Sequence, residues 1–239
     1  MTASLEPARR RPGSDNAGAV SVSVRVWDLP TRLFHWALTL TVACLLATGF
    51  GGVMEWHFRF GYASLSLLLF RVVWGLIGGR WSRFSAFIYA PRALVAYLRG
   101  QAHPDHLVGH TPLGALSVYA LLVLLIAQAS TGLVADDEIS ASGPLTRFVP
   151  GAVVSLASGW HVGFGKWIVI ALVSVHILAV LFYVRVKHQQ LVRPMLGGDK
   201  RIAAGAAASS RDDAASRTLA LVVIVICSGF AAWIASLRL

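Results

Sequence analysis

The sequence predicts an all-α integral membrane protein built as a helical bundle with five transmembrane spans. One reason is composition, because 56% of the 239 residues are hydrophobic and 13% are charged, against about 25% charged in soluble domains. The other is a set of five long apolar windows, each close to the ~20 residues that cross a bilayer. Backbone groups in hydrocarbon must be bonded within their own segment, so the windows are predicted to be helices. The windows are 33–53, 58–78, 112–134, 160–184 and 219–237.

Capping signals place the starts of two helices. Asp28 can cap a helix with Pro30 in its first turn, so the first helix is predicted to begin before its apolar window. Thr111 followed by Pro112 opens the third helix in the same way. The first apolar window starts too late and is too long for a secretory signal peptide.

The segments outside the windows complete the predicted organisation. Residues 1–24 are predicted to be a disordered cytoplasmic tail, and the alternating stretch 22–26 is not predicted to be a strand. A short amphipathic helix is expected at 91–99 on the inner surface. Residues 25–201 form the predicted membrane domain, and 202–239 form a linker and an additional transmembrane helix.

Charge alternates between the two sides of the predicted membrane. Residues 1–32, 79–111 and 185–217 hold 5, 4 and 7 of the 21 Lys and Arg. This positive-inside pattern places the N-terminus in the cytoplasm and the C-terminus outside. The formal net charge of +10 therefore reflects topology and attraction to an anionic bilayer, and does not indicate nucleic-acid binding.

The two cysteines lie inside predicted helices. Cys44 and Cys227 suggest no disulfide framework, and no C-x-x-C-H motif for covalent haem attachment is present.

Four histidines fall at matched depths. His161 and His176 lie on the fourth helix, about 22 Å apart along the axis and roughly 60° apart around it. Topology pairs His161 with His57 near the outer side and His176 with His35 near the inner side. A lone histidine near a helix end is more often an interfacial polar residue. Two stacked pairs, however, suit two bis-histidine haem sites that carry electrons across a membrane.

Four segments resemble the bacterial cytochrome b561 and Ni,Fe-hydrogenase cytochrome b subunit family. They are VWDLPTRLFHW from Val26, WHFRFGYASLSLLLFRVVWGLIGGRWSRFS, GHTPLGALSVYALLVLLIAQASTGL and HILAVLFYVRVKHQQLVRPMLGGDK. The resemblance covers about residues 25–201 and implies a four-helix di-haem core, to which the fifth C-terminal helix is an addition. The stretch SLASGWHVGF departs from a regular helix start.

The family's ligand pattern extends to this chain position by position. It implies that His35, His57, His161 and His176 bind the iron of two haem b groups. It also implies the bacterial inner membrane, a quinone, and a periplasmic c-type cytochrome or hydrogenase-like redox subunit as partner.

Three arginines are candidates for binding haem propionates. Arg71 is the charge deepest in the bundle, near the level of the inner haem, although it could instead extend to the interface. Arg59 is the corresponding candidate at the outer haem and Arg32 at the inner one.

Other polar residues and glycines have more than one interpretation. Gln128, Ser130 and Thr131 could bond a haem edge or a quinone, but hydrogen bonding between helices is the expected role. Some glycines could allow close approach of helices or of a flat porphyrin: Gly49, Gly61, Gly75 and Gly132.

A histidine-rich stretch, HPDHLVGH, lies in an inner loop. His103, His106 and His110 could bind a metal, but a solvated surface loop is expected because Asp105 is the one carboxylate nearby. His110 could also lie near an inner quinone or propionate.

The sequence thus predicts a di-haem b-type cytochrome that transfers electrons between a quinone pool and a redox partner. The alternative is a stand-alone quinone-linked oxidoreductase that acts on a small redox substrate at the outer haem. A haem-free, histidine-lined transporter is a third class, which turnover and haem measurements would distinguish from the others.

Overall fold

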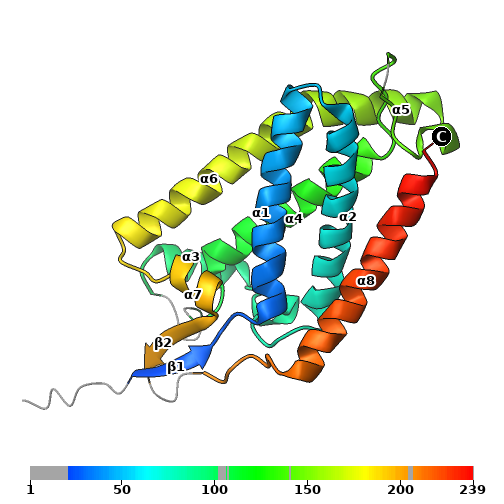
Figure 1. Ribbon diagram of the computed structural model, residues 1–239. Helices are drawn as coiled ribbons and strands as arrows, with labels where there is room; N and C mark the ends of the chain where they lie inside the picture. The colour runs from blue at the N-terminus through cyan, green and yellow to red at the C-terminus, as the bar shows by residue number, and fades with distance from the viewer. Residues whose placement is uncertain (1–20, 102–105, 107, 140, 204–206, 239) are drawn as a thin grey trace, which may run out of the picture.

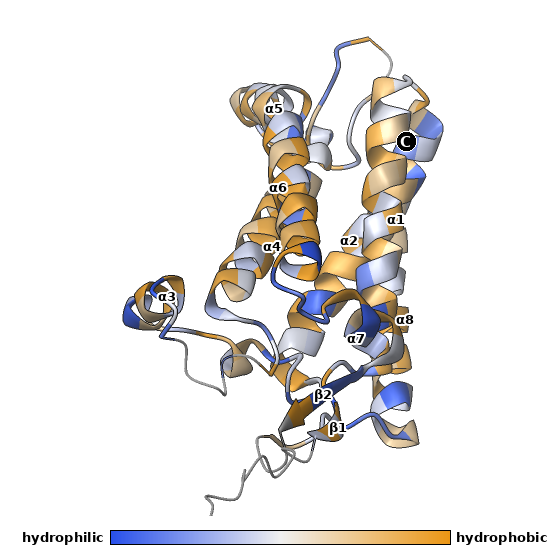
Figure 2. Ribbon diagram, turned by 90° about the vertical axis from the view of Figure 1, so that its left-hand side faces the viewer, coloured by the Kyte–Doolittle hydropathy of each residue, from blue (hydrophilic) through white to orange (hydrophobic). Residues whose placement is uncertain are grey.

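A computed structural model describes residues 21–101, 106, 108–139, 141–203 and 207–238. Within these residues, five helices are long and apolar enough to cross a membrane, which confirms the predicted all-α membrane bundle (Figures 1 and 2). They are α1 (Leu29–Phe50), α2 (Met54–Ile77), α4 (Pro112–Gly132), the continuous helix made of α5 (Gly151–Ser158), η4 (Gly159–Gly165) and α6 (Lys166–Arg185), and α8 (Ala214–Ser236).

Both predicted helix caps are present. The Asp28 carboxylate accepts a hydrogen bond from the Thr31 backbone N–H at 2.8 Å, and α1 accordingly begins at Leu29. The Thr111 hydroxyl accepts from the Gly114 N–H at 3.1 Å at the start of α4. Each cap binds a backbone donor that has no partner inside its helix.

Helix α2 is the centre of the bundle. It packs against α1, α4 and α8, while α6 packs against α4. In Figure 1, α6 slants away from α1 toward the lower end of the molecule. A buried cluster of Val42, Leu124 and Val169 joins α1, α4 and α6 halfway along the bundle.

The fifth helix is an integral part of this bundle. Phe70 and Trp74 of α2 form a buried cluster with α8 residues that include Val223. The Ser66 and Ser228 hydroxyls are hydrogen-bonded at 2.8 Å across the same interface. One face of α8 therefore covers α2.

A two-stranded ribbon at the lower end corrects the expectation of no strand near residues 22–26. Strand β1 (Ser21–Arg25) pairs antiparallel with β2 (Asp199–Ala203), with Val22 opposite Ile202. The partner strand lies far along the chain, so local alternation could not reveal the pairing. The ribbon also crosses two predicted boundaries, because residues 21–24 are strand and β2 spans the 201/202 division. Residues 1–20 of the predicted tail lie outside the described residues.

Two aspartates tie the lower end together. Asp28 is fully buried and also accepts hydrogen bonds from the Gly79 N–H and the Ser82 hydroxyl, each at 3.0 Å. Asp212 lies between Arg25 (2.6 Å) and Arg217 (3.0 Å). These contacts join the ribbon, the start of α1, the end of α2 and the start of α8.

Short elements complete the fold. The predicted amphipathic helix is present as α3 (Pro91–Leu98), which stands to one side of the bundle in Figure 2. The Tyr97 hydroxyl donates to the Tyr183 hydroxyl at 3.1 Å and so connects α3 to α6. The remaining elements are η1 (Phe84–Ala86), η3 (Thr146–Phe148) and α7 (Val192–Gly197).

Candidate functional site

The four predicted histidines form two levels, named here by their place in Figure 1. The upper pair is His57 of α2 and His161 of η4, at the end that carries α5. The lower pair is His35 of α1 and His176 of α6, toward the ribbon.

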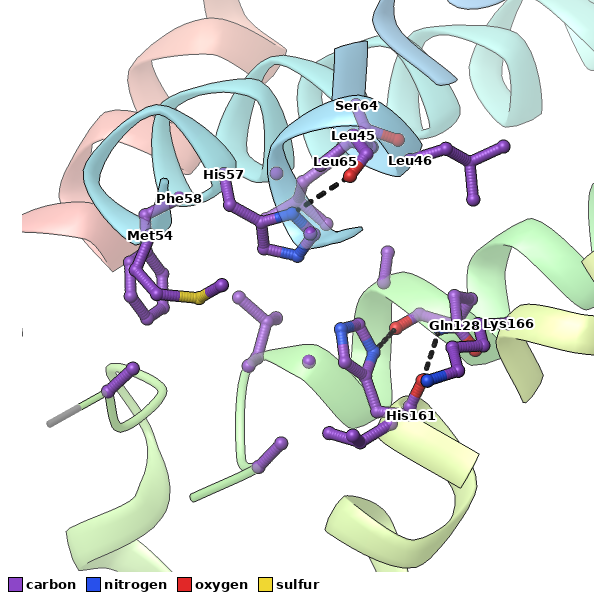
Figure 3. A pocket seen from close by; sticks show the side chains of 18 of the residues that line it. Leu45, Leu46, Met54, His57, Phe58, Ser64, Leu65, Gln128, His161 and Lys166 are labelled. Atoms are coloured by element: carbon purple, nitrogen blue, oxygen red, sulfur yellow. Dashed lines mark hydrogen bonds between the residues drawn. The ribbon is translucent and has the colours of Figure 1, made fainter. Parts of the chain in front are cut away.

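The upper pair has the geometry of two ligands that share one metal. The ring centroids of His57 and His161 are 6.1 Å apart, with the planes at 78°. Two metal–nitrogen bonds of about 2 Å, added to the distances from ring centre to nitrogen, predict roughly 6 Å. The two imidazoles face each other across a cavity (Figure 3).

One nitrogen of each upper ring is already held by the backbone. His57 Nδ1 lies 3.1 Å from the Leu45 carbonyl oxygen, and His161 Nδ1 lies 2.8 Å from the Gln128 carbonyl oxygen. Because a carbonyl only accepts, each Nδ1 must carry the proton, which leaves Nε2 as the unprotonated nitrogen. This arrangement orients metal-binding histidines and fixes their tautomer.

Glycines give the two rings their space. A Cβ on Gly132 would lie 2.6 Å from His161 Cε1, and one on Gly49 would lie 3.2 Å from His57 Cε1. Gly61 has open space beside it and lines the cavity. Named contacts therefore support the predicted close approach at Gly49 and Gly132, where the group approached is the imidazole, whereas Gly61 has no neighbour within 4 Å.

The upper cavity has a volume of ≈ 380 Å³ and lies between α1, α2, α4 and η4. Its walls are mainly apolar and include five leucines, and His57 and His161 are the two histidines among the lining residues. Asp136 and Asp137 line it on the loop side, and Lys166 is the cation on its wall. Lys166 had no predicted role, although its position five residues after His161 on a helix is a signal that could have indicated one.

The lower pair has different hydrogen-bonding partners. His176 Nδ1 lies 3.3 Å from the Ser117 hydroxyl of α4, whereas His35 Nδ1 is buried without a partner among the described residues.

Arg71 is a buried cation near the lower end of α2. It is 4% exposed, its guanidinium lies over the Phe84 ring at 4.6 Å, and its Nη1 atom has no hydrogen-bond partner within the described part of the chain. Gly75 makes room for that ring, because a Cβ there would lie 2.2 Å from Phe84 Cε2. A buried cation with an unpartnered donor suits a carboxylate ligand.

His110 corrects the expectation of a solvated loop. Its ring packs between Trp27 (4.6 Å between centroids) and Phe87 (4.4 Å), and its Nδ1 is buried without a partner among the residues described. Burial, with smaller effects of the positive charges of Arg71 and His35, lowers the pKa of His110 to about 3. His110 is therefore a neutral, packed residue next to the lower site.

His106 is the other histidine of this stretch that the structure describes. His106 packs against Tyr89 with 4.7 Å between ring centroids, and His103 lies outside the described residues. No group of three or more His, Cys, Asp or Glu that could hold a metal ion occurs within the described ranges.

The other two candidate arginines bind elsewhere. Arg59 pairs with Glu55 at 3.0 Å and its side chain is 59% exposed, so it is not part of the cavity wall. Arg32 donates to the Leu196 carbonyl and lies 4.0 Å from Asp212, although its Nε is buried without a partner in the described structure. Of the three candidate arginines, Arg71 is thus the one best placed to bind a propionate.

The three polar residues of α4 differ in their contacts. Gln128 bonds the neighbouring helix through both its backbone and its side chain, as expected for hydrogen bonding between helices. Thr131 bonds carbonyls of its own helix, and Ser130 is exposed.

Comparisons with known proteins match the same part of the chain. The family model of prokaryotic cytochrome b561 matches residues 26–198. Probable Ni/Fe-hydrogenase B-type cytochrome subunits are similar. The one from Azotobacter chroococcum mcd 1 is 25% identical over 74% of this chain and 88% of its own length. The subunit from Cupriavidus necator is 24% identical over 78% of this chain and 90% of its own length. The subunit from Escherichia coli K12 is 24% identical over 70% of this chain and 85% of its own length.

No solved structure matches the chain significantly. The family model nevertheless spans more than half of the sequence and contains all four histidines of the two levels. The chain therefore belongs to the prokaryotic cytochrome b561 family, whose members are multi-pass b-type cytochromes of electron transfer.

Proposed function

We propose that this protein is a di-haem b-type cytochrome that carries electrons across the bacterial inner membrane between a quinone pool and a redox partner. The observation that carries the proposal is the upper pair, with imidazole centroids 6.1 Å apart and each Nδ1 held by a backbone carbonyl. When bound, haem supplies an iron that accepts and releases one electron at a time.

The chain's own residues provide orientation and insulation. His57 and His161 would hold the upper haem, and His35 and His176 the lower one. The apolar cluster of Val42, Leu124 and Val169 packs α1, α4 and α6 together, and Val42 and Val169 also line the upper cavity. A dry, fixed environment limits the reorganisation that accompanies each change of charge.

Arg71 would neutralise a propionate of the lower haem. Its unpartnered Nη1 donor needs an acceptor, and 4% exposure leaves little access to water. Lys166 is the cation that could serve the upper haem, since it lines the cavity and Arg59 does not.

The relatives favour one partner over the other. They are named as cytochrome subunits of Ni/Fe-hydrogenases, and they match over most of their own length. We therefore infer a hydrogenase-like redox subunit as partner in preference to a c-type cytochrome. Reduction of quinone by the isolated chain with a small donor, without a partner subunit, would instead favour the stand-alone oxidoreductase.

Haem stoichiometry in the detergent-purified protein tests the proposal. A pyridine haemochrome assay should give about two non-covalent b haems per chain, and single His→Ala variants should assign them. One haem would refute one of the two sites. A protein without haem after expression with adequate haem supply would refute the cytochrome proposal and favour the transporter class.

A further inference from the structure

The helix that carries His161 is not a regular α-helix at that point. Between α5 and α6, residues Gly159–Gly165 form a π-helical segment with His161 inside it. Such widened turns within α-helices are rare and occur often at functional sites. The sequence GWHVGFG supplies three glycines there, which lowers the preference for a regular α-helix.

One residue of the neighbouring helix binds both the ring and the backbone of His161. The Gln128 carbonyl oxygen accepts from His161 Nδ1 at 2.8 Å, and the Gln128 side-chain Nε2 donates to the His161 carbonyl oxygen at 2.9 Å (Figure 3). The ring and the main chain of His161 are thereby fixed to the same point of α4. Inside a membrane neither bond can be replaced by bulk water, so losing the side-chain bond leaves a carbonyl with one partner fewer.

Gly165 provides the space for this amide. A Cβ on Gly165 would lie 2.2 Å from Gln128 Oε1 and 2.7 Å from Trp160 Nε1, and Gly165 itself is buried. Any side chain at 165 would displace the Gln128 amide. The π-helical segment and Gln128 therefore form one packing unit.

We propose that Gln128 is a positioning residue that sets the rotation of the His161 imidazole at the upper haem, through its two bonds to His161 and the space left by Gly165. The inference rests on the proposed function. The planes of His57 and His161 stand at 78°, and the hydrogen bonds that orient axial ligands tune the iron that they hold. Turning His161 should therefore change the electronic state of the upper haem without removing it.

The test compares Gln128→Met with Gln128→Glu in the full-length, haem-loaded protein. Met has a similar length but cannot donate to the His161 carbonyl. Glu has the same shape, and burial favours its neutral form, which can donate through its O–H. Ser130→Ala is the matched control, because Ser130 lies two residues away on the exposed side of α4. Low-spin ferric EPR and redox titration are the readouts, since the ferric signal of a bis-imidazole haem depends on the angle between the ligand planes.

The upper signal is the one that His57→Ala removes, and the lower haem is an internal control for folding. We expect Gln128→Met to shift the EPR signal and the midpoint potential of the upper haem alone, Gln128→Glu to restore most of the shift, and Ser130→Ala to match the wild type. An unchanged upper signal in Gln128→Met, or equal shifts in the Met and Glu variants, would overturn the inference.

A second variant keeps the test decisive if Gln128→Met loses both haems. Gly165→Ala retains the amide but occupies its space, so it should shift the upper signal in the same way, and a wild-type spectrum would overturn the inference. The two failures remain distinguishable, because a wild-type protein without an upper haem would refute the proposed function instead.

Discussion

Replacing Gly132 with alanine should weaken the upper haem site through a collision whose size the structure gives. The new Cβ would lie 2.6 Å from His161 Cε1, where ordinary contacts begin at 3.4 Å, so the ring must retreat by about 0.8 Å. Gln128 lies on the same helix as Gly132, so a retreat along the bond would stretch the 2.8 Å distance from His161 Nδ1 to at most about 3.6 Å, which is beyond hydrogen-bonding range. Loss of such a supporting bond typically costs 10- to 100-fold in affinity for the bound group, or about 1.4–2.8 kcal/mol.

Haem retention during dilution in detergent, followed by absorbance and by pyridine haemochrome, measures the effect. Two further glycines grade it. Gly49→Ala should be milder, because its Cβ contact with His57 is 3.2 Å, and Gly229→Ala on α8 should be neutral, because nothing lies within 4 Å of it. A Gly132→Ala protein that retains both haems as tightly as the Gly229→Ala control would refute this prediction.

Four further outcomes are expected. Arg71→Leu should weaken retention of the lower haem or lower its potential, and unchanged haem content and potential would contradict the propionate pairing. Asp28→Ala leaves several buried donors unpaired and should lower the free energy of unfolding by about 3–5 kcal/mol, measurable as a fall in Tm. Burial alone would raise the pKa of Asp212, but the hydrogen bonds and charges that surround it, that of Arg217 foremost, lower it below the usual value. The Asp212 carboxylate should therefore contribute its full stabilisation above about pH 4 and lose it as the pH falls through the lowered pKa. In acid unfolding, the Asp212→Asn variant should lack this pH-dependent loss of stability. Deleting residues 202–239 should lower thermal stability by exposing the apolar face of α2, and a truncated protein that reduced its partner at the normal rate would show that α8 does not dock it.

The long helices and the two levels of histidines could be predicted because they follow from local patterns. Apolar length marks a span, and a histidine's distance from the end of its span gives its depth. The charge alternation then predicts which histidines share a level. Span length, histidine depth and charge alternation do not depend on how the helices pack.

Features that depend on contacts distant in sequence could not be predicted. Strand β1 pairs with a segment about 180 residues later. The sequence places His110 in a loop, and its burial depends on contacts with Trp27 and Phe87 that the local pattern does not indicate. Arg59 has the right depth for the upper haem, but it lies on a side of α2 away from the cavity, where Glu55 is its partner.

The π-helical segment changes the predicted angle between His161 and His176 but leaves them on the same side of the helix. The offset of roughly 60° between His161 and His176 assumes fifteen regular α-helical steps of 100°. If the widened turn absorbs one residue, fourteen steps remain, and the offset becomes roughly 40° in the opposite sense. Both values leave the two imidazoles on the same side of the helix, so the paired arrangement tolerates the irregularity. The direction in which His161 points does not, because it is set by the Gln128 contacts and the space at Gly132 and Gly165. The depth of each ligand therefore follows from its position along one helix, whereas the orientation of its ring depends on contacts between two helices.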